Sequence, residues 1–316
     1  MKIALMQIYP NKTFNVKKAI DAHLRNSIII AHYLGAELLM VEDDYLRAIK
    51  KKYDVLIMTY ASFYAPFNLI KKMVQNNPDA LHVLFANEYN QTSNIAPFTP
   101  PFLYIANFET PAITKKNILE FHCLNLNLLL SKNANQLSTK KYDCIYYGTF
   151  RPNRAKYLEE YIHSPIYLST SDKNFKKYKH VGCNPRWIKK LTWQPRKETL
   201  NQFKYSLYLE DDYTHDVFNN LANRWYEAGF SNVVMFFDVN TWNTIRKSEI
   251  GYFENQIKDY IVSSHDELIK KIEYCNENFE KHLAVQKSWR LQEPLLKKQL
   301  LENIRNIIYN YSKQST

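Results

Sequence analysis

The sequence predicts an α/β protein built from two successive doubly wound units, followed by helices at the carboxyl end. Apolar, strand-like segments alternate with segments of helical periodicity over residues 1–130, and the alternation starts again after the polar stretch 131–141. Strands that alternate with helices form parallel sheets covered on both faces. A chain of 316 residues is also long enough for two such units.

The first half opens with a strand at residues 3–8 and a helix at 16–34, in which apolar residues recur at helical spacing. The remaining elements expected in this half are strands at 38–41, 54–59, 81–86, 103–107 and 123–130, and a helix at 67–74. Strands and helices that alternate in this way imply a parallel sheet with helices on both faces.

The second half repeats the pattern. The elements expected there are strands at 143–147, 166–168, 205–209 and 233–237, and helices at 153–162 and 217–228. Ser264 and Glu267 form a capping box for a helix from about residue 265, and Pro294 fits the first turn of a last helix ending near Tyr311. We therefore expect domains at 1–135 and 136–260, with helices over 261–316 that pack across both.

The charge balance favours an anionic partner. The net charge is +11, which suits nucleic acid, a phosphate-rich substrate or a membrane surface, although a lysine-rich surface that only keeps the protein in solution is an alternative. Cys123, Cys144, Cys183 and Cys275 form no C-x-x-C pair and suggest neither zinc nor disulfides. No run approaches the roughly 18 apolar residues of a membrane span. We expect a cytoplasmic protein that does not bind membranes.

Glycine is scarce, so each one marks a position where the backbone has special requirements. The chain has 5 glycines, where an average chain of this length carries about 22. Gly35 and Gly229 each follow a helical segment and precede a strand, as a glycine just past a helix end does. Gly148 differs, because it follows the strand at 143–147 directly and marks a turn from strand to loop.

Two motifs in the second half suit a phosphate-bearing ligand. In the first, Gly148 is followed by Arg151, Arg154 and the start of a helix, whose free N–H groups attract anions. In the second, Arg224 and Glu227 lie three residues apart on one helix, so they share a face. The first motif also fits an ordinary turn with two surface arginines, and the second fits a surface ion pair of little energetic value.

These stretches resemble a known family. Residues 143–154 (DCIYYGTFRPNR), 166–178 (IYLSTSDKNFKKY) and 208–238 (YLEDDYTHDVFNNLANRWYEAGFSNVVMFFD) are similar to corresponding stretches of the bacteriophage DNA β-glucosyltransferases. Those enzymes transfer glucose from UDP-glucose to hydroxymethylcytosine in duplex DNA. The likeness covers most of the second half, whereas the first half matches only in outline, at residues 2–4 and 82–89. The resemblance implies two Rossmann-like lobes facing a cleft, the GT-B arrangement.

The resemblance also implies roles for individual residues. Arg151, Arg154 and Arg224 would hold the donor diphosphate, and Glu227 would accept hydrogen bonds from the ribose. The complete donor set expected is Gly148, Thr149, Phe150, Arg151, Arg154, Trp193, Arg224 and Glu227. Two departures from the phage pattern bear on it: Arg154 is one residue closer to Arg151, and two extra residues separate Phe218 from Arg224.

Sugar transfer needs a base to accept the proton of the acceptor hydroxyl. The phage enzymes place an aspartate just after the third main strand of the first lobe, and the simplest alignment puts Asn87 there, which cannot act as a base. Glu88 follows the same strand end and is the expected catalytic base. Binding of sugar hydroxyls, or no role beyond that of a loop acid, is the alternative for Glu88.

The acceptor side is expected from aromatic and basic residues. Tyr89 lies in a long loop where it suits stacking on a base or sugar, although structural packing explains it equally well. The acceptor or DNA-binding set expected is Asn87, Tyr89, Lys176, Lys177, Arg186, Lys189 and Lys190. Basic residues among aromatics suit a DNA backbone, and a solvated lysine face is the alternative. A modified base in DNA would have to flip out to reach the donor.

The sequence therefore predicts an inverting glycosyltransferase that moves a sugar from a UDP-sugar to a hydroxymethylated pyrimidine in phage double-stranded DNA. We expect a monomer that needs no obligatory metal. An acidic run, Glu210-Asp211-Asp212, leaves a metal-bound diphosphate as an alternative. Alternative functions are transfer to a surface glycan or small molecule, and DNA binding without catalysis on a degenerate transferase fold.

Overall fold

The computed structural model divides the chain into two compact units, Met1–Leu130 together with Leu295–Thr316, and Ser131–Pro294. It describes residues 1–6, 22–59, 67–86, 101–107, 118–131, 139–189, 191, 200–211 and 220–314. The helical region expected at 261–316 is thus shared between the units: residues up to Pro294 group with the second unit, and the last helix from Leu295 groups with the first.

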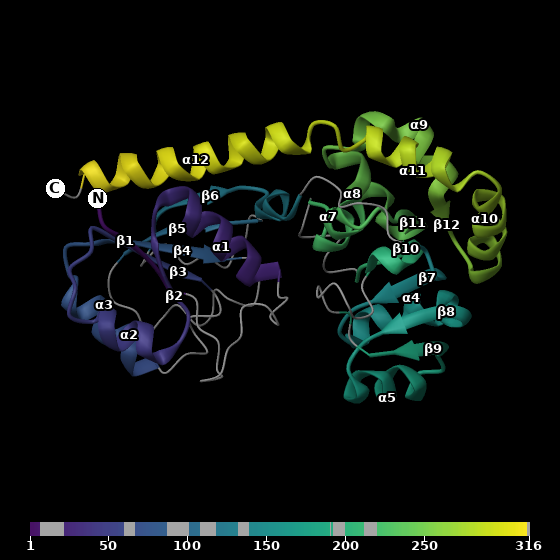
Figure 1. The fold of residues 1–316 in the computed structure, drawn as a ribbon, viewed down its shortest axis with the longest axis horizontal. Coiled ribbons are helices and arrows are strands. Elements are labelled where there is room, and N and C mark those ends of the chain that lie inside the picture. The colour runs from purple at the N-terminus through teal and green to yellow at the C-terminus, as the bar shows by residue number, and fades with distance from the viewer. Residues whose placement is uncertain are drawn as a thin grey trace. The chain divides into compact units, whose positions relative to one another are not determined.

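The first unit contains a six-stranded parallel sheet in the order β2-β1-β3-β4-β5-β6 (Figure 1). Its elements are β1 (Ile3–Met6), α1 (Ala22–Leu34), β2 (Glu37–Leu39), α2 (Glu42–Ala48), β3 (Val55–Thr59), α3 (Phe67–Asn76), β4 (Leu81–Ala86), β5 (Phe102–Ala106), β6 (Ile118–Cys123), a 3₁₀ helix (Leu126–Leu130) and α12 (Glu293–Gln314). Strand order reverses at β1, as in a doubly wound fold.

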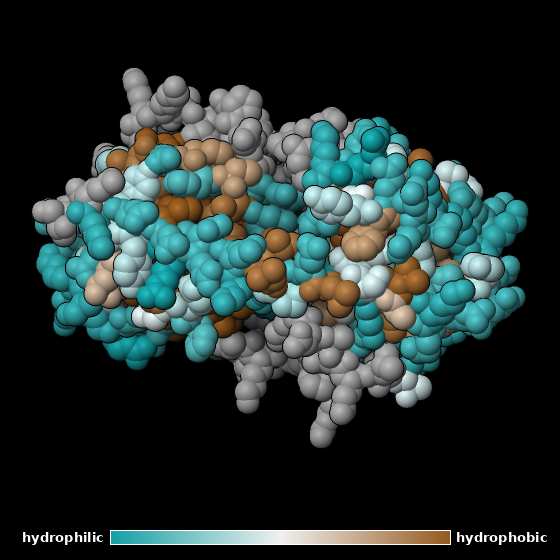
Figure 2. Space-filling view, turned by 90° about the horizontal axis from the view of Figure 1, so that it is seen from above, coloured by the Kyte–Doolittle hydropathy of each residue, from teal (hydrophilic) through white to brown (hydrophobic). Residues whose placement is uncertain are grey.

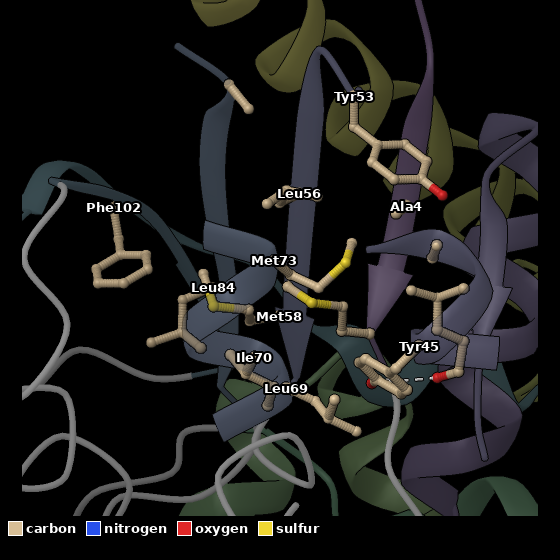
Figure 3. Close-up of a cluster of buried hydrophobic side chains, with 14 of the residues drawn as sticks. Ala4, Tyr45, Tyr53, Leu56, Met58, Leu69, Ile70, Met73, Leu84 and Phe102 are labelled. Carbon is tan, nitrogen blue, oxygen red and sulfur yellow. Dashed lines mark hydrogen bonds between the residues drawn. The ribbon is translucent and has the colours of Figure 1, made fainter. Parts of the chain in front are cut away.

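The sheet of the first unit is buried on both faces. Consecutive residues of β3, from Val55 to Met58, have no solvent exposure, which is typical of a central strand in a parallel sheet. On one face, Leu56 and Met58 pack with Tyr45 of α2 and Met73 of α3 (Figure 3). This apolar layer holds β3 and its neighbour β4 in place. The residues expected on the acceptor side follow the carboxyl end of β4 in the sequence.

The second unit contains another six-stranded parallel sheet, in the order β12-β11-β10-β7-β8-β9. Its elements are β7 (Tyr142–Tyr147), α4 (Pro152–Tyr161), β8 (His163–Ser169), α5 (Asp172–His180), β9 (Asn184–Ile188), β10 (Phe203–Tyr208), α7 (Asn223–Phe230), β11 (Val234–Asp238), α8 (Trp242–Lys247), α9 (Glu254–Ile257), β12 (Ile261–Val262), α10 (His265–Glu277) and α11 (Phe279–Ser288). From β7 the chain winds outward through β8 and β9, returns to β10 beside β7, and continues to β12. This is the dinucleotide-fold order, with its switch point between β7 and β10.

The expected fold class, two doubly wound α/β units, is confirmed, but several local predictions are wrong or incomplete. The strand expected at residues 123–130 is a 3₁₀ helix, Leu126–Leu130, preceded by β6, which ends at Cys123. Short apolar runs fit a buried strand or a buried helix equally well, so periodicity does not separate them. Helices α2 and α5 and strand β9 were not predicted, and α2 has a weak apolar pattern because only two of its seven residues are buried.

The glycine predictions have different outcomes. Gly35 has φ +64° at the end of α1, as expected of a glycine past a helix end. Gly229 does not end a helix, because it lies inside α7, and Asn232 adopts the left-handed conformation with φ 52° instead. A Cβ at Gly229 would lie 2.4 Å from the guanidinium of Arg290, so this glycine makes room for a buried side chain.

The Ser264 cap of the α10 helix is confirmed, but the return bond from Glu267 goes to the residue before the cap rather than to Ser264 itself. The backbone N–H of Glu267 donates to the Ser264 hydroxyl over 3.2 Å, and the Glu267 carboxylate accepts from the N–H of Ser263 over 2.8 Å. Pro294 lies in the first turn of α12, as expected. Both features stop the preceding segment and start a helix by satisfying or removing free N–H groups.

Among the described residues, no helix combines the length and apolarity needed to cross a bilayer. On the face seen in Figure 2, apolar side chains occur in small groups among hydrophilic ones.

Candidate functional site

The candidate donor site lies at the switch point of the second sheet. Gly148 comes directly after β7, and Glu210 and Asp211 come shortly after the neighbouring strand β10. The backbone N–H of Gly148 bonds to the carbonyl of Ser169 at the end of β8, over 3.2 Å. In open parallel sheets, loops at the carboxyl ends of the strands beside a switch point form the ligand-binding crevice.

Two helices bring arginines to this edge in their first turns. Helix α4 carries Arg154, and α7 carries Arg224. Neither helix has a side-chain cap: the residue before α4 is Arg151, held extended by the following Pro152, and the residue before α7 is Ala222. Helix N-termini carry partial positive charge, so both helices favour an anion at this edge.

Four side chains close a ring beneath the turn at Gly148. One carboxylate oxygen of Glu210 accepts from Nη2 of Arg154 over 2.5 Å, and the other accepts from Nη1 of Arg224. The hydroxyl of Tyr146 accepts from Nη1 of Arg154 over 3.2 Å and from Nη2 of Arg224 over 3.3 Å. Each guanidinium therefore contacts both the carboxylate and the phenol.

Gly148 is a glycine because this ring lies against it. A Cβ at Gly148 would lie 2.7 Å from Nη2 of Arg224, 3.5 Å from the Tyr146 hydroxyl and 3.6 Å from Nη1 of Arg154. The first of these distances is shorter than a carbon atom tolerates. The glycine that the sequence singled out as a turn thus also admits the guanidinium of Arg224 under the backbone.

Arg224 and Glu227 are buried rather than paired at the surface. Arg224 also donates to the carbonyls of Tyr147 over 3.0 Å and Leu209 over 3.2 Å. Glu227 accepts a hydrogen bond of 2.9 Å from the Tyr147 hydroxyl. The helix α7 therefore presents both residues to the end of β7, where the sequence analysis placed the diphosphate and ribose contacts.

The two ring arginines are firmly protonated. Burial is the largest single effect and acts to lower the pKa of Arg154 and of Arg224, but the Glu210 carboxylate together with Tyr146 and other neighbouring groups outweighs burial and leaves both pKa values raised above the ordinary range. The positive charges are thus permanent, and they are compensated within the protein.

Arg151 is the accessible cation of the site. Its side chain is 49% exposed, against 5% for Arg154 and 10% for Arg224. Its Nη1 lies 3.4 Å from a carboxylate oxygen of Asp211, a long contact that leaves the guanidinium facing solvent. An incoming phosphate would therefore reach Arg151 before the two buried arginines.

A basic, aromatic face adjoins the Gly148 turn. Lys176 and Lys177 are exposed on α5, Arg186 is exposed on the edge strand β9, and Lys189 follows that strand. The rings of Phe175 and Trp187 stack 5.2 Å apart among these cations. The ammonium of Lys177 lies 5.7 Å from the ring of Phe150, which packs on Tyr178, so the face reaches the loop after Gly148.

The structure brings together most of the predicted donor residues. Gly148, Thr149, Phe150, Arg151, Arg154, Arg224 and Glu227 all lie at the carboxyl edge of the second sheet, with Thr149 exposed in the loop. Asn87, Glu88, Tyr89, Lys190 and Trp193 lie outside the described residues, and their assigned roles stay predictions.

The sequence analysis missed four participants: Tyr146, Tyr147, Glu210 and Asp211. The tyrosines are the last residues of β7, where side chains alternate between the faces of the sheet. The acidic pair was noted only as a metal ligand. Its position after a strand adjacent to β7 is the signal that would have linked it to the arginines.

The acidic run contacts arginines in this structure. Within the described part of the chain, no group of three or more His, Cys, Asp or Glu side chains is arranged to hold a metal ion. Glu210 and Asp211 both contact Arg154, and Asp212 lies outside the described residues.

Comparison with known proteins supports the fold. No family model and no curated protein matches the chain. Solved structures do match. A structure of T4 phage β-glucosyltransferase with UDP and Mn²⁺ is 18% identical with a TM-score of 0.70, and it aligns over 98% of this chain and 99% of that chain. A second T4 phage β-glucosyltransferase structure, solved to study substrate binding and the catalytic mechanism, matches with a TM-score of 0.66. Its sequence identity is 17%, and it covers 98% of this chain and 99% of that chain.

A further structure, of the DNA modifying enzyme β-glucosyltransferase with and without uridine diphosphoglucose, has a TM-score of 0.71 at 17% identity over 98% of this chain. The likeness spans nearly all of both chains, so both sheets and the carboxyl-terminal helices are shared. The chain therefore has the fold of these phage enzymes, a pair of Rossmann-like units of the GT-B class. The resemblance noted from the sequence is confirmed at the level of the fold.

Proposed function

We propose that the protein is a glycosyltransferase that uses a UDP-sugar as donor. The observation that supports this most strongly is the gathering of Gly148, Arg151, Arg224 and Glu227 at the switch point of the second sheet. Neighbours with the same fold have been solved with UDP or uridine diphosphoglucose.

In this proposal, Arg151 contacts the diphosphate directly, and the helix N-termini of α4 and α7 add positive potential. Glu227 accepts hydrogen bonds from the ribose hydroxyls. It already accepts one from the Tyr147 hydroxyl, so a ribose oxygen bound there would join an existing polar network. Arginines and amides then compensate the charge that develops on the leaving diphosphate, and no metal is obligatory.

We further propose that the acceptor is a hydroxymethylated pyrimidine in phage double-stranded DNA. Glu88 would take the hydroxyl proton while the hydroxyl oxygen bonds to the anomeric carbon and the bond to the diphosphate breaks, with inversion. The basic face of Lys176, Lys177 and Arg186 would contact the DNA backbone. One of the neighbours with the same fold is a DNA modifying enzyme, which supports this acceptor.

The direct test is to incubate the protein with hydroxymethylated DNA and a panel of UDP-sugars, then to weigh the nucleosides after digestion. A hexose added to hydroxymethylcytosine supports the proposal. Loss of sugar from the donor with no modified nucleoside would favour a glycan or small-molecule acceptor. DNA binding without donor turnover would favour a non-catalytic DNA-binding protein. Glu88→Gln should abolish transfer, and donor hydrolysis that survives Glu227→Ala would remove the ribose assignment.

The DNA contact has its own test. Replacing Lys176 and Lys177 with glutamine should weaken duplex binding and lower the slope of log affinity against log salt by about 2, because each phosphate contact contributes about 0.9. Lys71→Gln with Lys72→Gln on α3 is the matched control, since these are also adjacent exposed helix lysines. Equal effects of the two pairs would count against a specific basic face.

A further inference from the structure

Glu210 is a buried carboxylate that pairs with two arginines of the site, and the proposed function assigns it no role. Its side chain is 4% exposed, and its two oxygens bond to different guanidiniums. Arg154 belongs to the first turn of α4 and Arg224 to the first turn of α7. One carboxylate therefore joins the starts of the two helices that point at the Gly148 turn.

The two guanidiniums would not stay together without this carboxylate. They share the hydroxyl oxygen of Tyr146, at 3.2 and 3.3 Å, so two positive charges lie within a few ångströms in a buried place. Like charges repel strongly where water is excluded. Glu210 offsets that repulsion, and its geometry closes the ring with Tyr146.

We propose that Glu210 is a positioning residue for the donor diphosphate: it fixes Arg154 and Arg224 beneath Gly148, so that Arg151 is left as the cation that meets the phosphate. The inference rests on the proposed donor site. It assigns a role to a residue that touches neither donor nor acceptor and acts through the arginines.

The hydrogen bonds of the ring arginines support this division of roles. Arg224 donates to Tyr146, to Glu210 and to two backbone carbonyls, so most of its N–H groups are used within the protein. Arg154 donates to Tyr146, Glu210 and Asp211. Among the described residues, the side chain of Arg151 contacts Asp211, at 3.4 Å, and about half of its surface is in solvent.

Glutamine is an informative replacement because it keeps the size of the side chain. Its amide offers one acceptor and one donor group, so one of the two guanidiniums would face N–H groups. The ring would open, and Nη2 of Arg224 would leave its place under Gly148. Moving Arg224 also loosens its bond to the backbone carbonyl of Tyr147, the residue whose side-chain hydroxyl donates to Glu227.

The experiment measures UDP affinity by calorimetry, alongside thermal unfolding, for the wild-type protein and three variants. Glu210→Gln should weaken UDP binding about ten- to a hundredfold, the effect of losing a charged hydrogen bond. Glu293→Gln is the matched control. Glu293 forms a buried ion pair with Arg290, with 3.2 Å between the carboxylate oxygen and Nη1, and neither residue belongs to the ring. It should lower the unfolding temperature and leave UDP affinity unchanged. The double variant Glu210→Gln with Arg154→Gln should bind UDP more tightly than Glu210→Gln alone. The second change removes the Arg154 guanidinium, whose N–H groups would otherwise face the N–H group of the new amide.

Each outcome decides the matter. Equal UDP affinity for wild type and Glu210→Gln would overturn the positioning role. So would equal losses for Glu210→Gln and Glu293→Gln, which would reveal general loosening, or a double variant weaker than the single one. If the wild-type protein does not bind UDP at all, the proposed function fails and this inference fails with it.

Discussion

The two ends of helix α7 bind cations in opposite ways, a buried arginine at one end and a partly buried lysine at the other. At its start, Arg224 meets the carboxylate of Glu210, and the pKa of Arg224 is raised. At its end, the ammonium of Lys140 donates to three carbonyls, those of Phe203 over 2.9 Å, Ser231 over 3.3 Å and Asn232 over 2.6 Å. Burial lowers the pKa of Lys140 to about 8, despite the opposing attraction of Glu280.

The difference teaches how each cation serves the fold. A carboxylate partner makes the charge at Arg224 permanent, which suits a site that must attract an anion. Carbonyl dipoles satisfy the hydrogen bonds of Lys140 without cancelling its charge. The lysine therefore stabilises the end of the helix and offers no site for an anion. The contrast predicts that changes at the first end alter ligand binding, and that changes at the second alter stability alone.

Arg224→Met should have the largest effect. Removal of one partner leaves Glu210 buried with only Arg154, which should cost about 3–5 kcal/mol of unfolding free energy. UDP affinity should fall about a hundredfold, because the ion pair with Glu210 and the bond to the Tyr147 carbonyl are lost together and the ring beneath Gly148 opens. Denaturant unfolding and calorimetry measure the two quantities. Normal UDP affinity in this variant would contradict the prediction that the start of α7 serves ligand binding.

Gly148→Ala should have the second largest effect on UDP affinity. Its Cβ would lie 2.7 Å from Nη2 of Arg224, so the guanidinium must move. We expect UDP affinity to fall about tenfold, with a loss of about 1–3 kcal/mol from overpacking. Gly182→Ala is the control, because Gly182 has φ +94° but open space around it. That change should strain the backbone and leave UDP affinity as it was; a matching loss would contradict the steric explanation.

Lys140→Met should change stability without changing the site. Because the pKa of Lys140 in the folded protein is about 8, below the usual 10.5, the unfolded chain binds more protons between these values. The free energy of unfolding of the wild type should therefore rise between pH 8 and 10.5 by about 1–3 kcal/mol relative to the variant. UDP affinity at pH 7 should stay within about twofold. Parallel pH curves for the two proteins would be the contrary result.

Tyr147→Phe should have the smallest effect. It removes the hydroxyl that donates to Glu227 over 2.9 Å and leaves the backbone carbonyl that binds Arg224. We expect UDP affinity to weaken about three- to tenfold, while stability changes by no more than about 1 kcal/mol. Competition between UDP and a deoxyribose analogue would sharpen the result. An unchanged preference for ribose would argue against Glu227 as its acceptor.

Much of the fold could be predicted because alternating strand and helix patterns are local. The turn at Gly148 and the arginine-bearing helix α7 were predicted from neighbouring residues alone. Local signals failed where an apolar run fits two structures, as at Leu126–Leu130, or where a distant side chain sets the requirement. Gly229 is the clearest case: the space beside it is filled by Arg290, which lies far along the chain.

The candidate site was predicted in its parts rather than in its connections. Glu210 lies 56 residues from Arg154 in sequence and 14 from Arg224, so no local pattern links them. The link comes from strand order, which places β10 beside β7 although β8 and β9 intervene in the chain. From the sequence, Arg151 and Arg154 are both expected to hold the diphosphate, and only their burial in the structure reveals that one faces solvent and the other is enclosed.

The central claim is that the edge around Gly148 binds a nucleoside diphosphate through Arg151. Modification of the wild-type protein by phenylglyoxal, followed by peptide mass spectrometry, tests it most directly. Arg151 should react in the free protein and be protected by UDP but not by uridine, while exposed Arg305 on α12 reacts equally throughout. Reaction of Arg151 at the same rate with and without saturating UDP would contradict the account.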